Sequence, residues 1–133
     1  MSTSSTIHFV RDGLPLAIVY RHCDGYPSGA GTDLLRFISE IEHNAVDQRF
    51  DDPVFLAARY VVWLAQSAPV SCPFDFFGVG VVTSDPGDIA YRYVVDCSGP
   101  RGSRPGVRCV WLDFDEDQYI PPPEESAAAG AAL

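Results

Sequence analysis

Hydrophobic and polar positions change their spacing several times along the chain, and each spacing predicts a different element. Residues 6–10 and 14–21 are largely apolar and flank the dipeptide Asp12-Gly13. Asp-Gly favours the tight turns that join two antiparallel strands. The pattern therefore predicts an opening β-hairpin.

Residues 32–46 have the spacing of an amphipathic helix. We expect Thr32 to cap its first turn and Asp33 to interact favourably with the positive end of the helix dipole. The apolar positions share one stripe, at Leu34, Ile38, Ile41 and Ala45.

A second helix is predicted from Pro53 to about Ser67. Asp52 is a suitable N-cap, and proline is well tolerated at the first helical position because its missing N–H has no partner there. The helix is apolar on nearly all sides, so we expect it to be the most buried element.

The second half of the chain predicts three strands. Residues 76–84 and 89–97 are separated by Asp-Pro-Gly-Asp at 85–88, which predicts a second hairpin. A last strand covers residues 107–114. Two glycines in the first of these strands indicate a bulge or a close backbone approach, at Gly78 and Gly80.

The order of the elements, ββααβββ, predicts an α+β fold. We expect an antiparallel sheet with two helices packed on one face, because all connections are short enough for neighbouring strands to pair. Residues 1–114 would form this single domain. Residues 115–133 are acidic and rich in proline and alanine, which predicts a disordered tail.

The net charge of −9 is concentrated near the C-terminus. Six of the 18 acidic residues lie between positions 113 and 125, and the remaining 12 acids and 9 arginines leave only −3. Binding to duplex nucleic acid needs clustered cations, so we do not expect it.

The sequence begins without the pattern of a secretory signal, and its longest apolar stretch is interrupted by Arg59. We therefore expect a soluble cytoplasmic protein that neither enters nor binds a membrane. The cysteines show neither C-x-x-C spacing nor a nearby histidine pair, so we expect free thiols and no metal. A disulfide between Cys97 and Cys109 is geometrically conceivable, but a reducing compartment disfavours it.

Residues 20–31, YRHCDGYPSGAG, lie between the predicted hairpin and the first predicted helix. The N–H groups of Gly29 and Gly31 would form a concavity for an anion at the helix start, with Arg21 and His22 adding positive charge and donors. Alternatively, the Asp-Gly pair forms a turn and the glycines only permit a tight strand-to-helix crossing. The candidate ligand-binding residues here are Arg21, His22, Asp24, Tyr26, Gly29 and Gly31.

The same stretch follows the pattern Y-x-H-x-D-G-Y-P-x-G-x-G, with Tyr20, His22, Asp24, Gly25, Tyr26, Pro27, Gly29 and Gly31 at its fixed positions. In this it resembles a family of small uncharacterised proteins of bacteria and phages. Cys23 stands where that family has tryptophan, and cysteine cannot stack on a base as tryptophan can. The resemblance implies a shared fold and a phage or prophage setting.

A second candidate site is the arginine loop, residues 99–108. Arg101, Arg104 and Arg108 lie close together among glycine and proline. Each guanidinium offers paired donors to a phosphate, so the loop would close over an anionic ligand. Alternatively, the loop is solvated and its arginines form exposed ion pairs with Asp96, with Asp113 or with the acidic tail.

Two further patterns give weaker indications of a functional site. His22 and Cys23 are adjacent on an extended chain, so their side chains point apart and would not form a catalytic pair. Tyr91 and Tyr93 share one face of a strand and belong either to the core or, on an uncovered face, to a stacking platform or subunit interface.

The sequence predicts a binding protein rather than an enzyme, and it predicts no cofactor. The first hypothesis is capture of an anionic, nucleotide-like small molecule between the two candidate loops, in a homo-oligomer. In size and outline such a protein is similar to phage proteins that sequester immune nucleotide signals, the anti-Thoeris sponges. The second hypothesis is a protein–protein interaction module, binding for example a host protein, with no small-molecule site.

Overall fold

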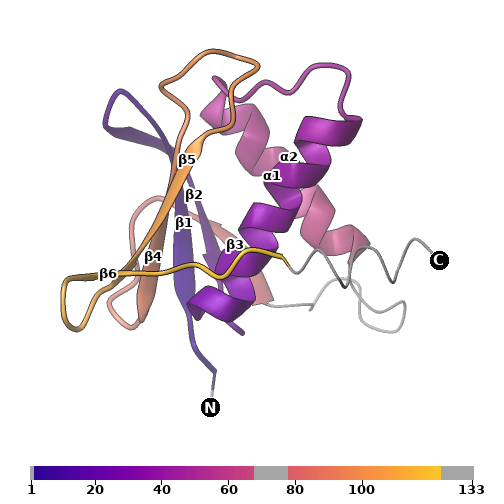
Figure 1. The fold of residues 1–133 in the computed structure, drawn as a ribbon. Coiled ribbons are helices and arrows are strands. Elements are labelled where there is room, and N and C mark those ends of the chain that lie inside the picture. The colour runs from indigo at the N-terminus through magenta and orange to yellow at the C-terminus, as the bar shows by residue number, and fades with distance from the viewer. Residues whose placement is uncertain (1, 68–77, 124–133) are drawn as a thin grey trace.

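The computed structural model describes residues 2–67 and 78–123 (Figure 1). Two helices, α1 (Thr32–Asn44) and α2 (Pro53–Gln66), follow the first two strands, and a short π-helical turn, η1 (Pro27–Gly31), leads into α1. The strands are β1 (Ser5–Arg11), β2 (Leu14–Arg21), β3 (Val79–Val82), β4 (Tyr91–Asp96), β5 (Gly106–Trp111) and β6 (Glu116–Gln118).

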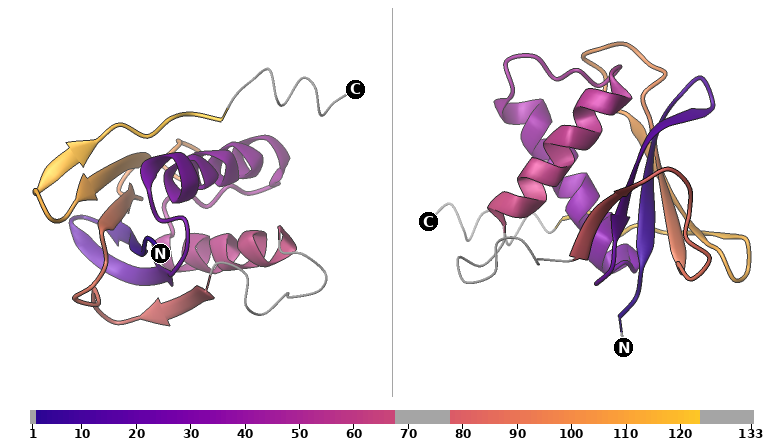
Figure 2. Two further views of the ribbon diagram at one scale, coloured as in Figure 1. Left: turned by 90° about the horizontal axis from the view of Figure 1, so that it is seen from below. Right: turned by 180° about the vertical axis from the view of Figure 1, so that it is seen from behind.

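The predicted α+β class is confirmed, with a sheet that is mixed rather than purely antiparallel. Its strand order within the described residues is β3-β2-β1-β4-β5-β6. β1 and β4 pair in parallel, and the other neighbours are antiparallel. Both helices lie on one face of this sheet, which the two views of Figure 2 show from below and from behind.

The opening hairpin is confirmed. β1 and β2 pair in antiparallel register with Arg11 opposite Leu14. The connecting residues Asp12 and Gly13 have positive φ values of 51° and 80°. A type I′ turn requires positive φ at both of its central residues, and it matches the right-handed twist of the two strands.

The predicted second hairpin is wrong. β3 pairs with β2 and β4 pairs with β1, so the two strands lie on opposite sides of the first hairpin. The connection over residues 83–90 crosses the sheet instead of making a tight turn. The Asp-Pro-Gly-Asp signal at 85–88 marks an irregular segment correctly, but a local signal cannot specify which strand lies beside which.

The two helix starts differ in how well the sequence predicted them. Asp52 caps α2 as expected, since its carboxylate accepts a hydrogen bond of 3.1 Å from the Phe55 N–H. Thr32 does not cap α1. The turn η1 extends the helix backwards to Pro27, and the Thr32 hydroxyl donates to the Pro121 carbonyl at 2.7 Å.

The core lies between the helices and the sheet. Ile7 and Phe9 of β1 and Tyr93 of β4 are fully buried there, facing α1 and α2. Tyr93 donates a 2.7 Å hydrogen bond to the Gly25 carbonyl. Of the two alternatives for Tyr91 and Tyr93, the core position is therefore correct, and neither tyrosine lies on the uncovered face.

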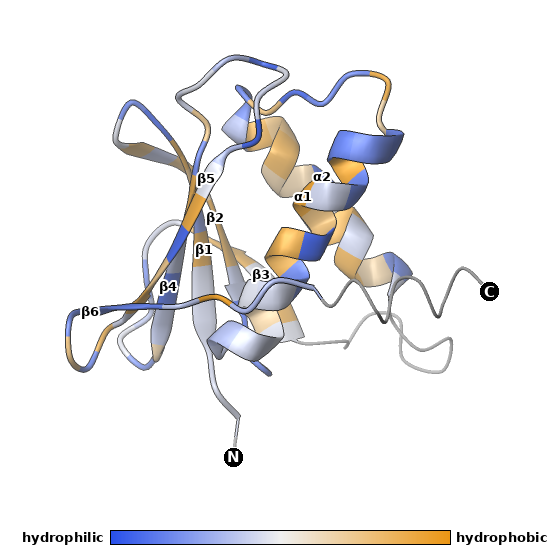
Figure 3. Cartoon of the chain, in the orientation of Figure 1, coloured by the Kyte–Doolittle hydropathy of each residue, from blue (hydrophilic) through white to orange (hydrophobic). Residues whose placement is uncertain are grey.

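α2 is not the most buried element. Its positions Val54 and Val62 are 57% and 56% exposed, whereas the residues of β1 are mostly buried. Figure 3 shows hydrophobic or neutral colours over most of α2, so an apolar helix lies at the outside of the molecule.

The chain remains ordered beyond residue 114, where the predicted tail begins. Residues 116–118 form β6 beside β5, and Ile120 packs against Gly31, where an added Cβ would lie 2.9 Å from the isoleucine Cγ2. The tail expectation therefore fails for this part. Its remaining residues, 124–133, lie outside the described residues, as do Cys72, Phe74, Phe76 and Phe77.

Candidate functional site

The glycine-containing loop between β2 and α1 uses its backbone donors internally. The Gly25 N–H donates to the Thr3 carbonyl at 2.8 Å, and the Gly29 N–H donates to the Tyr26 carbonyl at 2.9 Å. An added Cβ on Gly29 would lie only 2.4 Å from the Asp24 carbonyl oxygen. The structure therefore favours the tight-turn alternative, and the Gly29 N–H is not available to a ligand.

Arg21 is buried on the helix-covered face, with 1% of its surface exposed. Its Nη1 donates to Asp33 at 2.9 Å and its Nε donates to the Cys23 carbonyl at 2.9 Å. This cation therefore fixes the end of β2 to the start of α1. The prediction that Arg21 contributes to a surface anion site is wrong.

The other side chains of this loop lie at the surface. The ring Nδ1 of His22 is 2.9 Å from the Tyr20 hydroxyl, and Tyr26 donates to the Asp24 carboxylate at 3.1 Å. This hydrogen bond and the negative charge of Asp24 raise the pKa of Tyr26. The Cys23 thiol donates to the Ser2 hydroxyl at 3.8 Å.

The arginine loop is held by acids of the helical layer. Arg101 makes two-pronged contacts with Asp47, the shortest of them 3.0 Å, and Arg104 lies 3.7 Å from Glu42. Hydrogen bonding from Arg101 lowers the pKa of Asp47. The ion-pair alternative is therefore favoured for these two arginines, although their partners are not the acids that the sequence suggested.

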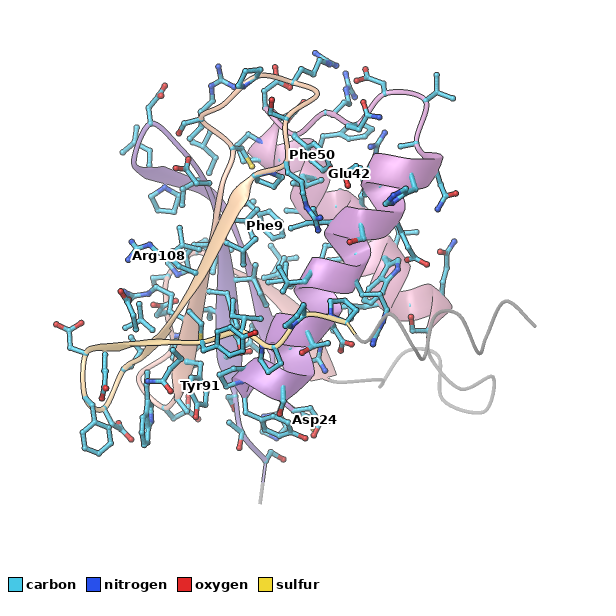
Figure 4. All side chains as sticks on the ribbon, viewed as in Figure 1. Phe9, Asp24, Glu42, Phe50, Tyr91 and Arg108 are labelled. Atoms are coloured by element: carbon cyan, nitrogen blue, oxygen red, sulfur yellow. The ribbon has the colours of Figure 1, made fainter. Side chains whose placement is uncertain are left out.

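The two predicted loops do not form a common site. Figure 4 shows Asp24 at the start of α1 and Glu42, the partner of Arg104, at its far end. Arg108 lies on β5 and points to the sheet face that the helices leave uncovered. A single small anion therefore cannot touch both loops, and the predicted joint site for a nucleotide-like ligand is not assembled.

The sequence analysis missed a polar cluster on the uncovered face of the sheet. Asp85, in the crossing segment, accepts hydrogen bonds from Thr6 at 2.6 Å and from Arg92 at 2.7 Å, and it lies 2.7 Å from His8 Nε2. Burial by itself raises the pKa of Asp85, but the hydrogen bonds from its three partners outweigh it and lower the pKa. Only the alternation of β1, which places Thr6 and His8 on one face, was visible in the sequence.

Two of the described thiols, those of Cys97 and Cys109, are buried. Burial raises the pKa of Cys97 to about 12 and that of Cys109 to about 11, so both stay protonated at neutral pH. Cys23, Cys97 and Cys109 are free. In the described part of the chain, no three histidine, cysteine or acidic side chains are grouped as metal ligands would be.

A groove of about 530 Å³ lies between α1 and α2, on the side away from the sheet. Glu40 and Arg59 are the charged residues of its lining. Its apolar walls come from both helices and include Phe37, Ile41, Phe55, Ala58, Val62 and Trp63.

Polar contacts and ring packing position the aromatic side chains of the groove. The Trp63 indole N–H donates to the Glu40 carboxylate, and its ring lies 5.9 Å from that of Phe37. The guanidinium carbons of Arg49 and Arg59 lie 4.0 and 4.4 Å from the Phe55 ring centroid. Such cation–π contacts keep the phenylalanine in place at the surface.

Comparison of the chain with protein-family models, curated proteins and solved structures found no match. No helix within residues 2–67 and 78–123 is long and apolar enough to cross a membrane. The lining of the α1–α2 groove makes it a candidate site on geometric grounds.

Proposed function

We propose that this chain is a protein-interaction module that receives an apolar helix of a protein partner in the α1–α2 groove. The observation that carries the proposal is the position of α2. This helix is apolar on both its covered and its outward side, and its outward side lines an open groove. Helices with apolar residues on all sides are normally covered by protein.

The lining of the groove suits an apolar helix. α1 and α2 cross over the sheet, as Figure 1 shows, and the groove lies between α2 and the C-terminal half of α1. An amphipathic helix anchors apolar side chains at i, i+3, i+4 and i+7 in a groove of this kind. Aromatic residues such as Phe55 and Trp63 are typical anchors at interfaces of this kind.

The nucleotide hypothesis has less geometric support. It required the loop between β2 and α1 to lie beside the arginine loop. Arg101 and Arg104 instead form ion pairs with Asp47 and Glu42 of the helical layer. We keep the cytoplasmic setting as part of the proposal, because the buried free thiols Cys97 and Cys109 suit a reducing compartment.

Photo-crosslinking in bacterial cells tests the proposal. A p-benzoylphenylalanine replaces Val62 in the groove, and a control replaces Leu14, which is 63% exposed at the β1–β2 turn against 56% for Val62. Irradiation is expected to give a defined product only with the probe at position 62. Mass spectrometry identifies the crosslinked chain, which is then purified and titrated with the intact protein and with the Val62→Glu variant.

The proposal holds if the identified chain binds and Val62→Glu weakens binding by about tenfold or more. It fails if positions 62 and 14 give the same products or if Val62→Glu binds normally. Calorimetric titration with cyclic nucleotides and ADP-ribose derivatives tests the nucleotide hypothesis. Binding there that Arg101→Ala and Arg104→Ala abolish would favour the nucleotide hypothesis instead.

A further inference from the structure

Arg59 is a cation of the α1–α2 groove whose charge is not neutralised by an ion pair. Its Nη1 donates to the Asp47 carbonyl at 3.0 Å and to the Gln48 carbonyl at 3.2 Å. These contacts and the ring of Phe55 fix the guanidinium against the loop between α1 and α2. Carbonyls carry no formal charge, so Arg59 has no carboxylate partner in the described part of the chain.

The remaining donors of Arg59 form one edge of the guanidinium. Nε and Nη2 make no hydrogen bond within residues 2–67 and 78–123. The N–H groups of these two nitrogens are parallel and match the two oxygens of a carboxylate. Because Nη1 already holds the side chain in place, little further side-chain freedom is lost when this edge binds a ligand. The edge is therefore preorganised to receive a carboxylate.

The acids beside Arg59 have other partners. The carboxylate of Asp47 lies 3.0 Å from Arg101 and 3.9 Å from Arg49. Glu40, the acid of the groove lining, accepts from the Trp63 indole N–H. A carboxylate for the Nε and Nη2 edge therefore comes from another molecule.

We infer that the partner helix carries an aspartate or glutamate at the position that covers Arg59, and that Nε and Nη2 receive its carboxylate. This inference rests on the proposed function, because it names the chemistry of the helix that occupies the same groove. A helix seated there displaces water from the guanidinium, and a cation that loses water without gaining a partner is costly. A carboxylate offsets this cost, whereas an apolar side chain does not.

Glu40 limits where further acids can lie on the partner. It bonds to Trp63, which follows Arg59 by four residues and so lies one turn further along α2. The positive and the negative group of the groove are therefore separated along its length. A second acid of the partner beside Glu40 would meet a like charge, which disfavours it. The partner helix is thus expected to have an acid at Arg59 and a neutral or basic residue at Glu40.

Synthetic helical peptides test the inference without knowledge of the natural partner. Each is an alanine-based helix of about 18 residues with leucines at i, i+4 and i+7. A glutamate, a glutamine or a lysine stands beside the first, the middle or the last leucine. Fluorescence anisotropy at up to about 300 µM protein measures the dissociation constants. At one of the three positions, the glutamate peptide is expected to bind about tenfold more tightly than the glutamine peptide, and the lysine peptide most weakly.

Variants of Arg59 identify the receiving group. Arg59→Gln should abolish the preference for glutamate, and Arg59→Glu should reverse it in favour of lysine at the same position. Loss of support for the loop would instead weaken all three peptides alike, so a reversal is specific to direct contact. Arg104→Gln is the matched control, because Arg104 lies outside the groove, 3.7 Å from Glu42, and it should leave the preference unchanged. Circular dichroism checks that each variant is folded.

The intact protein supplies a second measurement that needs no variant. Raising the salt concentration from about 50 to about 500 mM should reduce the preference for glutamate over glutamine several-fold, because ions screen a partly exposed charge pair. The affinity of the glutamine peptide should change little.

Three results would overturn the inference: equal binding of the three peptides at every position, a preference for glutamate that salt does not reduce, or a preference that Arg59→Gln retains. In each of these cases a helix still binds in the groove, and the proposed function stands. If no peptide binds the intact protein at any position, the proposed function fails together with the inference.

Discussion

Asp85 illustrates how one side chain holds the topology of the sheet. It lies in the segment that crosses from β3 to β4, and it accepts from Thr6 of β1 and from Arg92 of β4. Hydrogen bonds to a charged, largely buried acceptor are each worth about 1.5–3 kcal/mol. The carboxylate therefore fixes the crossing segment to the two parallel strands beneath it.

Replacing Asp85 by asparagine should lower the free energy of unfolding at pH 7 by about 2 kcal/mol. The pKa of Asp85 is lowered in the folded state, so its stabilisation is complete above the unfolded value of about 3.9 and is lost as the pH falls through the folded value. The difference between the two proteins should therefore shrink in strong acid. Urea unfolding at pH 7 and at about pH 2.5 measures it.

Asp88→Asn is the matched control, because Asp88 is an exposed acid of the same crossing segment. Equal effects of the two variants at pH 7, or a difference that does not diminish in acid, would contradict the role given to the Asp85 carboxylate.

At the scale of elements, the junction between β2 and α1 explains the glycines of the YRHCDGYPSGAG stretch. Gly29 packs against the Asp24 carbonyl, and Gly31 packs between Tyr93 and Ile120. Each glycine therefore allows a close approach between elements, which is sufficient reason for its position without a ligand.

Gly29→Ala should destabilise the protein by about 1–3 kcal/mol, because its Cβ would lie 2.4 Å from the Asp24 carbonyl oxygen and the backbone must shift. Gly102→Ala, in the arginine loop, has open space around the added Cβ and should change stability by less than about 0.5 kcal/mol. Chemical unfolding of both variants compares them. A neutral Gly29→Ala would show that this glycine serves something other than packing.

Prediction of the elements succeeded where the signal was local. The Asp12-Gly13 turn requires positive φ at both residues, and the cap at Asp52 needs only the N–H of Phe55 three residues later. The cap at Thr32 failed because its hydroxyl bonds to Pro121, a residue that the sequence pattern assigned to a disordered tail. A contact between residues so far apart in the chain has no signature in the spacing around either of them.

At the scale of the molecule, two layers leave one helix uncovered on its outer side. The sheet buries one side of both helices, and nothing in the described part of the chain buries the outward side of α2. An α+β domain with helices on a single sheet face has no third layer. The exposed apolar groove is therefore a property of the architecture and not of one residue.

Binding of a partner in this groove predicts a higher melting temperature. A partner that binds only the folded state adds stability by mass action, about 2.7 kcal/mol at 100 times the dissociation constant. The chain identified by crosslinking at position 62, added at that excess, should therefore raise the melting temperature by roughly 5–11 °C. Scanning calorimetry measures this, with Val62→Glu as the variant whose melting temperature should change much less. An equal rise for both proteins would contradict binding in the groove.

Local sequence patterns are enough to predict the α+β class, the first hairpin, both helices and the apolar character of α2, because turn chemistry, helical spacing and capping act over a few neighbouring residues. Three further features emerge only when the chain is folded: β4 pairs with β1 and not with β3, Arg21 is buried against Asp33, and the two candidate loops lie at opposite ends of α1. Strand order and loop proximity depend on contacts between distant residues. For the same reason, the groove between α1 and α2 was visible only once both helices had been placed on the sheet.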